Sequence, residues 1–180
     1  LSFGAHTFLC ADTIFQHGTE VQRERYIPKL ASGEWIGCMG ITEPNAGSDV
    51  ASMRTTAVKR DGSWVLNGSK IFITNGGEAD IYTIVALTDP SKGARGASAF
   101  IIEKGTPGFS FGKSESKMGI HASATRELIF EGARIPAANL LGNYLGGFAN
   151  DGQIFSNTEF NADRAPANNS IDYFARLGNS

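Results

Sequence analysis

The sequence predicts a mixed α and β protein, in which the end of an N-terminal helical domain precedes an antiparallel β-sandwich or barrel. Over residues 5–30, apolar residues recur at spacings of three and four, which is typical of helices. From residue 35 to about residue 135, short β-type runs alternate with turn residues. After Gly142 the composition shifts to Asn, Gly and Ala without a clear period, which predicts loop or weakly specified structure.

The first segment predicts two helices. Phe8 and Phe15 belong to the apolar positions of the first helix, and Tyr26 and Leu30 to those of the second. Gly18 lies between these groups, and glycine weakens a helix interior. We therefore expect the helical segment to be broken at Gly18.

The middle of the chain predicts a sheet of short strands. Asp61-Gly62 is a strong hairpin signal, and the sequences NGG (75–77) and GTPGF (105–109) are further turn signals. No helical pattern lies between the runs, so we expect mainly antiparallel pairing. The runs are WIGCMGIT (35–42), SMRTTAVKR (52–60), SWVLNGSKIFIT (63–74), IYTIVALT (81–88), ASAFIIEK (97–104), FSFGKS (109–114) and RELIFEGARI (126–135).

Composition and charge exclude several classes of protein. The 16 basic and 18 acidic residues give a net charge of −2, which does not indicate nucleic acid or an anionic membrane as the main partner. No run approaches the roughly 20 apolar residues of a membrane span. Cys10 and Cys38 lie in apolar surroundings and predict buried thiols of a reducing compartment, and we expect no metal site. The chain begins without methionine or a basic leader, so we expect a fragment or processed product that is not secreted.

The loop GITEPNAGSD (40–49) is the first candidate binding element. Thr42 presents a hydroxyl where a strand ends, and Gly47 lets the backbone approach a ligand closely. The amides of residues 46–48, with the Ser48 hydroxyl, form a donor set suited to phosphate oxygens. An ordinary turn, in which Asp49 bonds its own backbone, is the alternative.

The segment KIFITNGG (70–77) is the second candidate element. It also ends a strand in a threonine, Thr74, and it carries an aromatic residue, Phe72. Two such strand ends can hold one flat heterocycle, because one offers polar donors and the other an aromatic face. Alternatively, Phe72 and Ile73 are ordinary alternating strand residues and Thr74 begins a turn.

Six segments resemble the acyl-CoA dehydrogenases, which are flavoenzymes that oxidise acyl thioesters. They are LSFGAH, RYIPKLASGEWIG, ITEPNAGSDVASM, LNGSKIFITNGGEAD, SAFIIEKGTPGF and KMGIHASATRELIFEGARIPAANLLG, and the motifs are most similar to isovaleryl-CoA dehydrogenase. The resemblance implies that residues 1–36 end an N-terminal helical domain and that residues 37–142 form the β-domain. Residues 143–180 are then a divergent tail, and the C-terminal helical domain is largely missing.

The resemblance also implies a set of ligand-binding residues. FAD is the expected cofactor, and Phe72 would cover the flavin while Thr74 bonds the ring near its reactive nitrogen. Ser48 and the stretch before GASAF would meet the acyl-CoA. The cofactor residues implied are Met39, Ile41, Thr42, Gly47, Ser48, Phe72, Ile73 and Thr74, and the substrate residues are Ser48, Ala94 and Arg95.

The resemblance assigns no catalytic base. FNADRA (160–165) is a faint echo of the segment that carries the glutamate in the isovaleryl type, which makes Asp163 a weak candidate and Glu159 no better. Pro166 would interrupt a helix there. His121 stands where the family usually has arginine, and we interpret it as structural, as we do His6 and His17.

The function that the resemblance implies is oxidation of an acyl-CoA to the 2,3-enoyl-CoA, with α-proton abstraction and hydride transfer to FAD. Electron-transfer flavoprotein or a similar acceptor would be the partner, in a homotetramer of the bacterial cytoplasm or mitochondrial matrix. An acyl-CoA oxidase and a catalytically silent flavin- or CoA-binding fragment are the alternatives. The sequence does not select an acyl chain.

Overall fold

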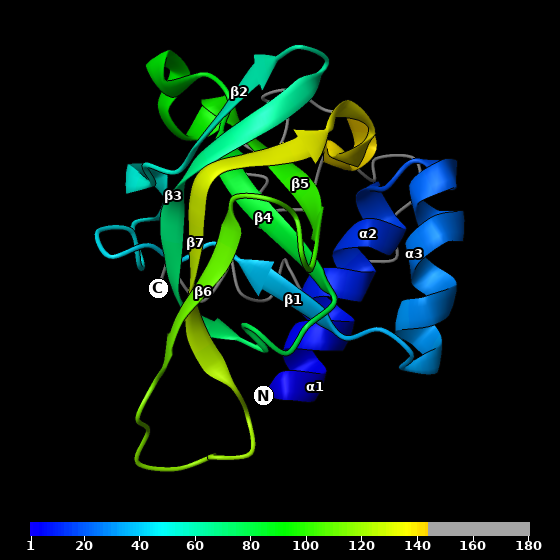
Figure 1. The fold of residues 1–180 in the computed structure, drawn as a ribbon, viewed down its shortest axis with the longest axis vertical. Coiled ribbons are helices and arrows are strands. Elements are labelled where there is room, and N and C mark those ends of the chain that lie inside the picture. The colour runs from blue at the N-terminus through cyan, green and yellow to red at the C-terminus, as the bar shows by residue number, and fades with distance from the viewer. Residues whose placement is uncertain (144–180) are drawn as a thin grey trace, which may run out of the picture.

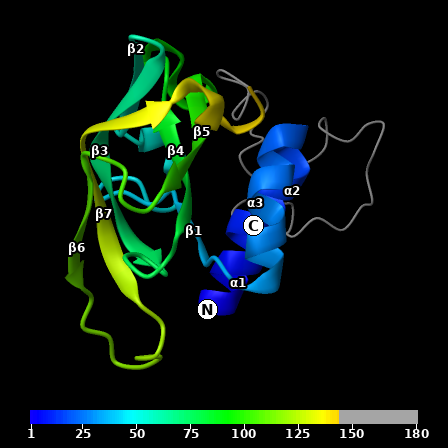
Figure 2. The same ribbon diagram turned by 45° about the vertical axis from the view of Figure 1, so that its right-hand side comes forward.

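A computed structural model describes residues 1–143, in which helices lie on one side of a curled sheet (Figures 1 and 2). The first helical rod consists of α1 (Ser2–Gly4), the π-helical segment η1 (Ala5–Ala11) and α2 (Asp12–His17). Gly18 leaves the helical conformation, and α3 (Glu20–Ser32) follows. Thr19 and Gln22 form a capping box at the start of α3. The predicted break at Gly18 is therefore confirmed.

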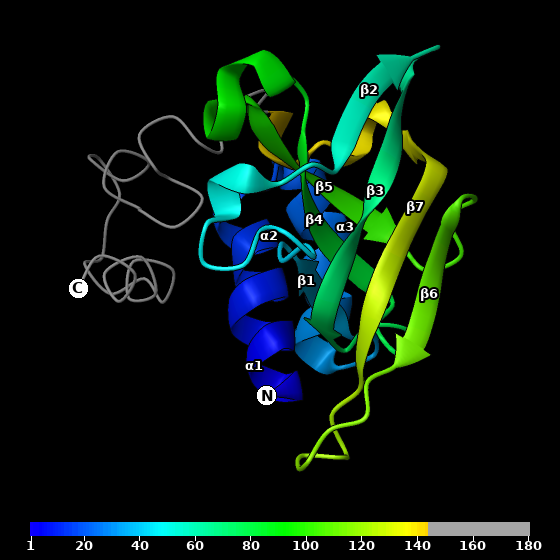
Figure 3. The same ribbon diagram turned by 90° about the vertical axis from the view of Figure 1, so that its left-hand side faces the viewer.

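Residues 37–136 form one sheet that curls into a half-barrel (Figure 3). Within the described residues the strand order is β1-β4-β2-β3-β7-β6, and β5 also pairs with β4. Short 3-10 turns, η2 (Val50–Ser52) and η3 (Pro90–Gly96), interrupt the connections. The strands are β1 (Gly37–Gly40), β2 (Thr56–Arg60), β3 (Ser63–Thr74), β4 (Ile81–Leu87), β5 (Ala97–Glu103), β6 (Phe109–Ser114) and β7 (Thr125–Pro136).

The strand pairing differs in one respect from the antiparallel expectation. The pairs β2–β3, β3–β7, β6–β7 and β4–β5 are antiparallel, as predicted. However, β1 runs parallel to β4, and the start of β2 also meets the end of β4 in parallel. A parallel pair requires a long crossover connection, which the chain between β1 and β4 supplies. The sheet is therefore mixed.

One apolar cluster packs the inside of the sheet, and another joins the sheet to the helices. One fills the concave interior and includes Phe100, Phe109 and Phe130. The other joins the helices to the opposite face of β4 and β5, and it includes Ile14 and Tyr26 together with residues of both strands. The helical rod is thus packed firmly against the strands that it precedes in the sequence.

The two cysteines are free thiols that are completely buried, as predicted. Burial raises the pKa of Cys10 to about 12 and also raises the pKa of Cys38. Within residues 1–143, no helix has both the length and the apolar character needed to cross a membrane. The predicted tail lies, from residue 144 onward, outside the described residues.

Candidate functional site

A pocket of about 380 Å³ lies where the ends of β1 and β3 meet the helical rod. Its volume falls within the range of about 300–1,000 Å³ that is usual for small-molecule sites. It brings together seven of the eight residues predicted to bind the cofactor. The lining consists of Ala5, Leu9, Met39, Ile41, Thr42, Gly47, Val50, Phe72, Ile73 and Thr74.

A β-bulge shapes the second strand end. The register of β3 against β7 shifts between Lys70 and Ile73, so that one extra residue is accommodated on β3. The amide of Ile71 then turns away from β7 and donates a hydrogen bond of 2.9 Å to the carbonyl of Thr42. The bulge therefore links the two strand ends directly.

Phe72 lies at this bulge with a φ of 58°, which is unusual for a bulky residue. Its side chain lines the pocket, yet it is 62% exposed. Packing within the chain does not explain why a strained backbone exposes this large apolar ring to solvent. The arrangement suits a flat ligand that would stack on the ring.

The two threonines offer polar groups to the same space. Thr42 and Thr74 are half-buried, and neither hydroxyl bonds another group in the part of the chain that the structure describes. Gly47 adds an open wall, because a Cβ built there would meet no atom within 4 Å. The pocket thus combines an aromatic face, two available hydroxyls and a close backbone approach.

The loop amides agree only in part with the predicted donor set. Ala46 donates its N–H to the Glu43 carbonyl at 3.1 Å, so this amide is already used. The amides of Gly47 and Ser48 make no such bond among residues 1–143. Ser48 is exposed and does not line the pocket. A phosphate site here would therefore use two amides rather than three.

In the alternative interpretation of this loop, the Asp49 side chain bonds its own backbone. The structure shows a different partner for this carboxylate. Asp49 instead accepts a hydrogen bond from the Ser52 hydroxyl. The carbonyl of Ser52 accepts a weak bond of 3.4 Å from the Asn45 side chain. These contacts join the two ends of the segment 45–52.

The helical rod contributes two lining residues, Ala5 and Leu9, that the sequence analysis did not select. Both lie in the π-helical segment, and π-helical turns are frequent at functional sites. Val50 was missed as well. The motif LSFGAH, which contains Ala5, is the sequence signal for this wall of the pocket.

The predicted CoA contacts lie elsewhere. Ala94 and Arg95 belong to η3, and Arg95 is not among the residues that line the pocket. Arg95 is exposed, and the side chain of Ala94 lies outside what the structure describes. The structure therefore does not bring Arg95 to the strand ends, and the CoA contact of this stretch stays a prediction.

The histidines have structural contacts. His6 accepts a hydrogen bond from the Gly37 amide at 2.8 Å, while its Nε2 lies 3.1 Å from the Leu30 carbonyl. His121 makes a 2.7 Å contact with the Lys117 carbonyl in an exposed loop. Burial lowers the pKa of His17, and the nearby Asp12 offsets this in part. None of the three lines the pocket.

The pocket lining contains no acidic side chain within residues 1–143. The weak candidates Asp163 and Glu159 lie outside the described residues. No group of three or more His, Cys, Asp or Glu residues that could hold a metal ion occurs in the described chain. The described residues therefore present binding groups but no proton-abstracting carboxylate.

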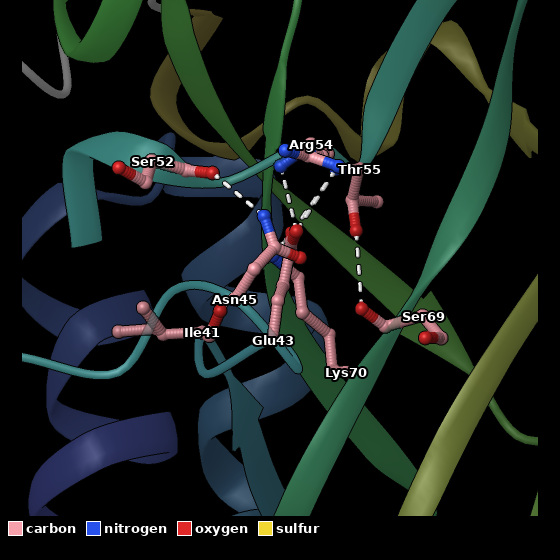
Figure 4. A network of polar contacts seen from close by, with 8 residues as sticks. All are labelled: Ile41, Glu43, Asn45, Ser52, Arg54, Thr55, Ser69 and Lys70. Carbon is pink, nitrogen blue, oxygen red and sulfur yellow. Dashed lines mark hydrogen bonds and ion pairs between the residues drawn. The ribbon is translucent and has the colours of Figure 1, made fainter. Parts of the chain in front are cut away.

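Behind the pocket lies a buried ion pair, drawn in Figure 4. Lys70 Nζ donates to Glu43 Oε1 at 2.7 Å, and the two side chains are 0% and 3% exposed. Burial alone would raise the pKa of Glu43, but the Lys70 ammonium and hydrogen bonds from the adjacent chain hold it below its ordinary value. Burial lowers the pKa of Lys70, and the carboxylate offsets this only in part. We treat the pair as charged, because the Glu43 carboxylate also accepts backbone N–H bonds that favour a negative charge.

Comparison with known proteins identifies the class to which this pocket belongs. Residues 38–133 match the acyl-CoA dehydrogenase middle domain, and residues 1–34 match the N-terminal domain of the same family. The chain belongs to the acyl-CoA dehydrogenase family. The family resemblance of the six motifs is thereby confirmed.

Individual relatives agree with this assignment. The chain is 50% identical to isovaleryl-CoA dehydrogenase from Pongo abelii, covering 79% of this chain and 34% of that protein. Its structure is similar to butyryl-CoA dehydrogenase from Megasphaera elsdenii, with a TM-score of 0.79, 53% identity and coverage of 82% and 39%. It is also similar to the FAD complex of PigA, with a TM-score of 0.78, 38% identity and coverage of 82% and 39%. The chain thus spans 34% to 39% of the length of these relatives.

Proposed function

We propose that this chain supplies the flavin-facing part of an enzyme that oxidises an acyl-CoA to the 2,3-enoyl-CoA with FAD. One observation carries the proposal: two strand ends place a strained aromatic ring and two available hydroxyls around one pocket. When bound, FAD would accept the hydride from the β-carbon of the acyl chain. Family membership supports the same chemistry.

The residues of the chain would divide the binding between them. Phe72 would cover one face of the flavin, and Thr42 and Thr74 would donate to its polar edge, where a hydrogen bond would stabilise arriving negative charge. The free amides of Gly47 and Ser48 would face the diphosphate. Arg95 would pair with a phosphate of the CoA, because a guanidinium suits phosphate oxygens.

The base that removes the α-proton is not among the pocket-lining residues described. A catalytically silent flavin- or CoA-binding fragment is therefore the second candidate function. An acyl-CoA oxidase, which would pass electrons to oxygen, is a further variant of the first. For the dehydrogenase we propose an electron-transfer flavoprotein as acceptor, a homo-oligomeric assembly and a location in bacterial cytoplasm or mitochondrial matrix.

Anaerobic titration of the FAD-loaded chain with acyl-CoAs of several lengths tests the proposal. A dehydrogenase bleaches the flavin absorbance, whereas a silent module retains it and an apoprotein that binds no flavin refutes the cofactor assignment. Peroxide formation in air separates the oxidase from an enzyme that needs an electron acceptor.

Replacement of the hydroxyls tests the site itself. The double variant Thr42→Val and Ser48→Ala should lose flavin affinity by about thirtyfold, because it removes two hydrogen bonds that contribute about 1 kcal/mol each. The dissociation constant follows from the quenching of flavin fluorescence. An unchanged constant in a folded variant would remove Thr42 and Ser48 from the site.

A further inference from the structure

The Glu43–Lys70 ion pair is buried next to the pocket, yet neither residue lines it. Lys70 lies on β3, directly before the bulge, and Glu43 follows Thr42 after the end of β1. Burying two charges is costly, and a hydrophobic pair of similar volume is often equally stable. Packing alone therefore does not explain why a charged pair occupies this position.

The contacts of Lys70 join the two strand ends. Its ammonium donates to the Ile41 carbonyl at 3.1 Å as well as to the Glu43 carboxylate. The next residue along β3, Ile71, donates its amide to the Thr42 carbonyl. Two consecutive residues of β3 thus hold the backbone of Ile41 and Thr42.

The contacts of Glu43 bring in a third segment. Its carboxylate accepts the amide of Arg54 at 2.6 Å and the amide of Thr55 at 3.1 Å (Figure 4). These residues close the loop that begins at Thr42 and carries Gly47. An apolar substitute for Glu43 would leave both buried amides without a partner.

We propose that the Glu43–Lys70 pair positions the two strand ends, so that flavin affinity depends on this pair although neither side chain touches the ligand. The inference rests on the proposed function. Removing the link would let the Thr42 strand end move relative to Thr74, and hydrogen bonds to one rigid ligand tolerate little displacement. The pair is thus a positioning element rather than part of the binding surface.

The test compares two chemically matched double variants of the 180-residue chain. Glu43→Gln with Lys70→Met removes the charges but keeps an acceptor for the two amides, which isolates the link to β3. Lys29→Met with Glu34→Gln makes the same changes at a solvent-exposed ion pair on the helical side. For each variant, thermal unfolding of the apoprotein, the FAD dissociation constant and the bound-flavin absorption spectrum are measured.

We expect the first variant to bind FAD about tenfold more weakly and to show an altered flavin spectrum, because both threonine contacts depend on the spacing. The Lys29 and Glu34 variant should retain the affinity and the spectrum. If the Glu43 and Lys70 variant folds and keeps its FAD affinity and flavin spectrum, this inference is overturned while the proposed function still stands. Failure of the unaltered chain to bind FAD would overturn the proposed function as well.

Hydrogen exchange on the unaltered chain tests the inference without any substitution. If the pair positions the site in advance, the amides of Arg54, Thr55 and Ile71 are protected in the absence of FAD. Exchange of these amides at the rate of an unfolded chain in the apoprotein would contradict the proposal, even where the double variant fails to fold.

Discussion

At the scale of single residues, Gly47 is the simplest probe of the pocket. A methyl group at this position meets no protein atom, and its φ lies outside the left-handed region. The space beside it is therefore available to a ligand rather than to the protein.

Gly47→Ala should leave the folding stability within about 0.5 kcal/mol, since no contact is lost and no backbone strain arises. It should weaken FAD binding, because the methyl group enters the ligand's space. Gly119→Ala is the matched control, as it too meets open space but lies in the β6–β7 loop away from the pocket. Equal FAD affinities for both variants, measured by fluorescence quenching, would show that no ligand approaches Gly47.

Phe72 offers a second test at the scale of single residues. One substitution removes the ring alone, and another removes both the ring and the backbone strain. Phe72→Gly removes both and should raise folding stability by up to about 1 kcal/mol, since glycine tolerates the positive φ. Phe72→Ala keeps the strain, so it should bring no such gain. Both should weaken FAD binding several-fold, in line with about 0.5–1.5 kcal/mol for stacking. Urea unfolding and flavin titration distinguish these outcomes, and intact affinity in both variants would exclude stacking on Phe72.

At the scale of elements, the loop from Thr42 to Thr55 depends on one carboxylate for its attachment. The pKa of Glu43 is held below its ordinary value of 4.5 in the folded chain. A group of this kind contributes stability that is fully present above its unfolded pKa and is lost as the pH falls through the folded pKa.

Stability should therefore decline below about pH 4.5 more steeply in the unaltered chain than in Glu43→Gln. Thermal unfolding between pH 7 and pH 3 measures this difference. Glu34→Gln, which changes an exposed carboxylate, should keep the steep decline. Parallel profiles for Glu43→Gln and the unaltered chain would mean that Glu43 is not ionised in the folded state.

Elements that depend on local chemistry were predictable from the sequence. The Asp61-Gly62 hairpin follows from turn chemistry, and both residues have the positive φ that a tight hairpin requires. The break at Gly18 is local in the same sense. The two strand ends were also found, because their threonines and glycines are visible as residue types.

Features that depend on distant partners were not predictable. The parallel pairing of β1 with β4 joins Gly37 to Ile81, and no local pattern distinguishes it from an antiparallel neighbour. The bulge before Phe72 appears in the sequence as continuous strand.

At the scale of the whole molecule, the reactivity of the two buried thiols indicates whether the chain is fully folded. Cys10 lies between the helical rod and β4, and Cys38 lies within β1 against the interior cluster. The raised pKa of both thiols leaves little thiolate at neutral pH, so reaction requires opening of the structure.

Labelling of these thiols by a chromogenic disulfide reagent at pH 8 should be slow in buffer and fast in denaturing urea. Saturating FAD should slow it further, since a ligand that binds only the folded chain stabilises that chain by mass action. Exposed Cys introduced by Ser91→Cys serves as the control, because it should react rapidly under all conditions. Rapid native labelling of the unaltered chain would contradict the packing of the helical rod on the sheet.

The parallel strand pair also bears on the order of events during folding. Because β1 pairs with β4 and not with a neighbour in the sequence, the end of β1 that lines the pocket is fixed only when this non-local pair has formed. A ligand that binds only the folded chain stabilises it by mass action, so we expect proteases to degrade the apoprotein more readily than the chain with FAD bound.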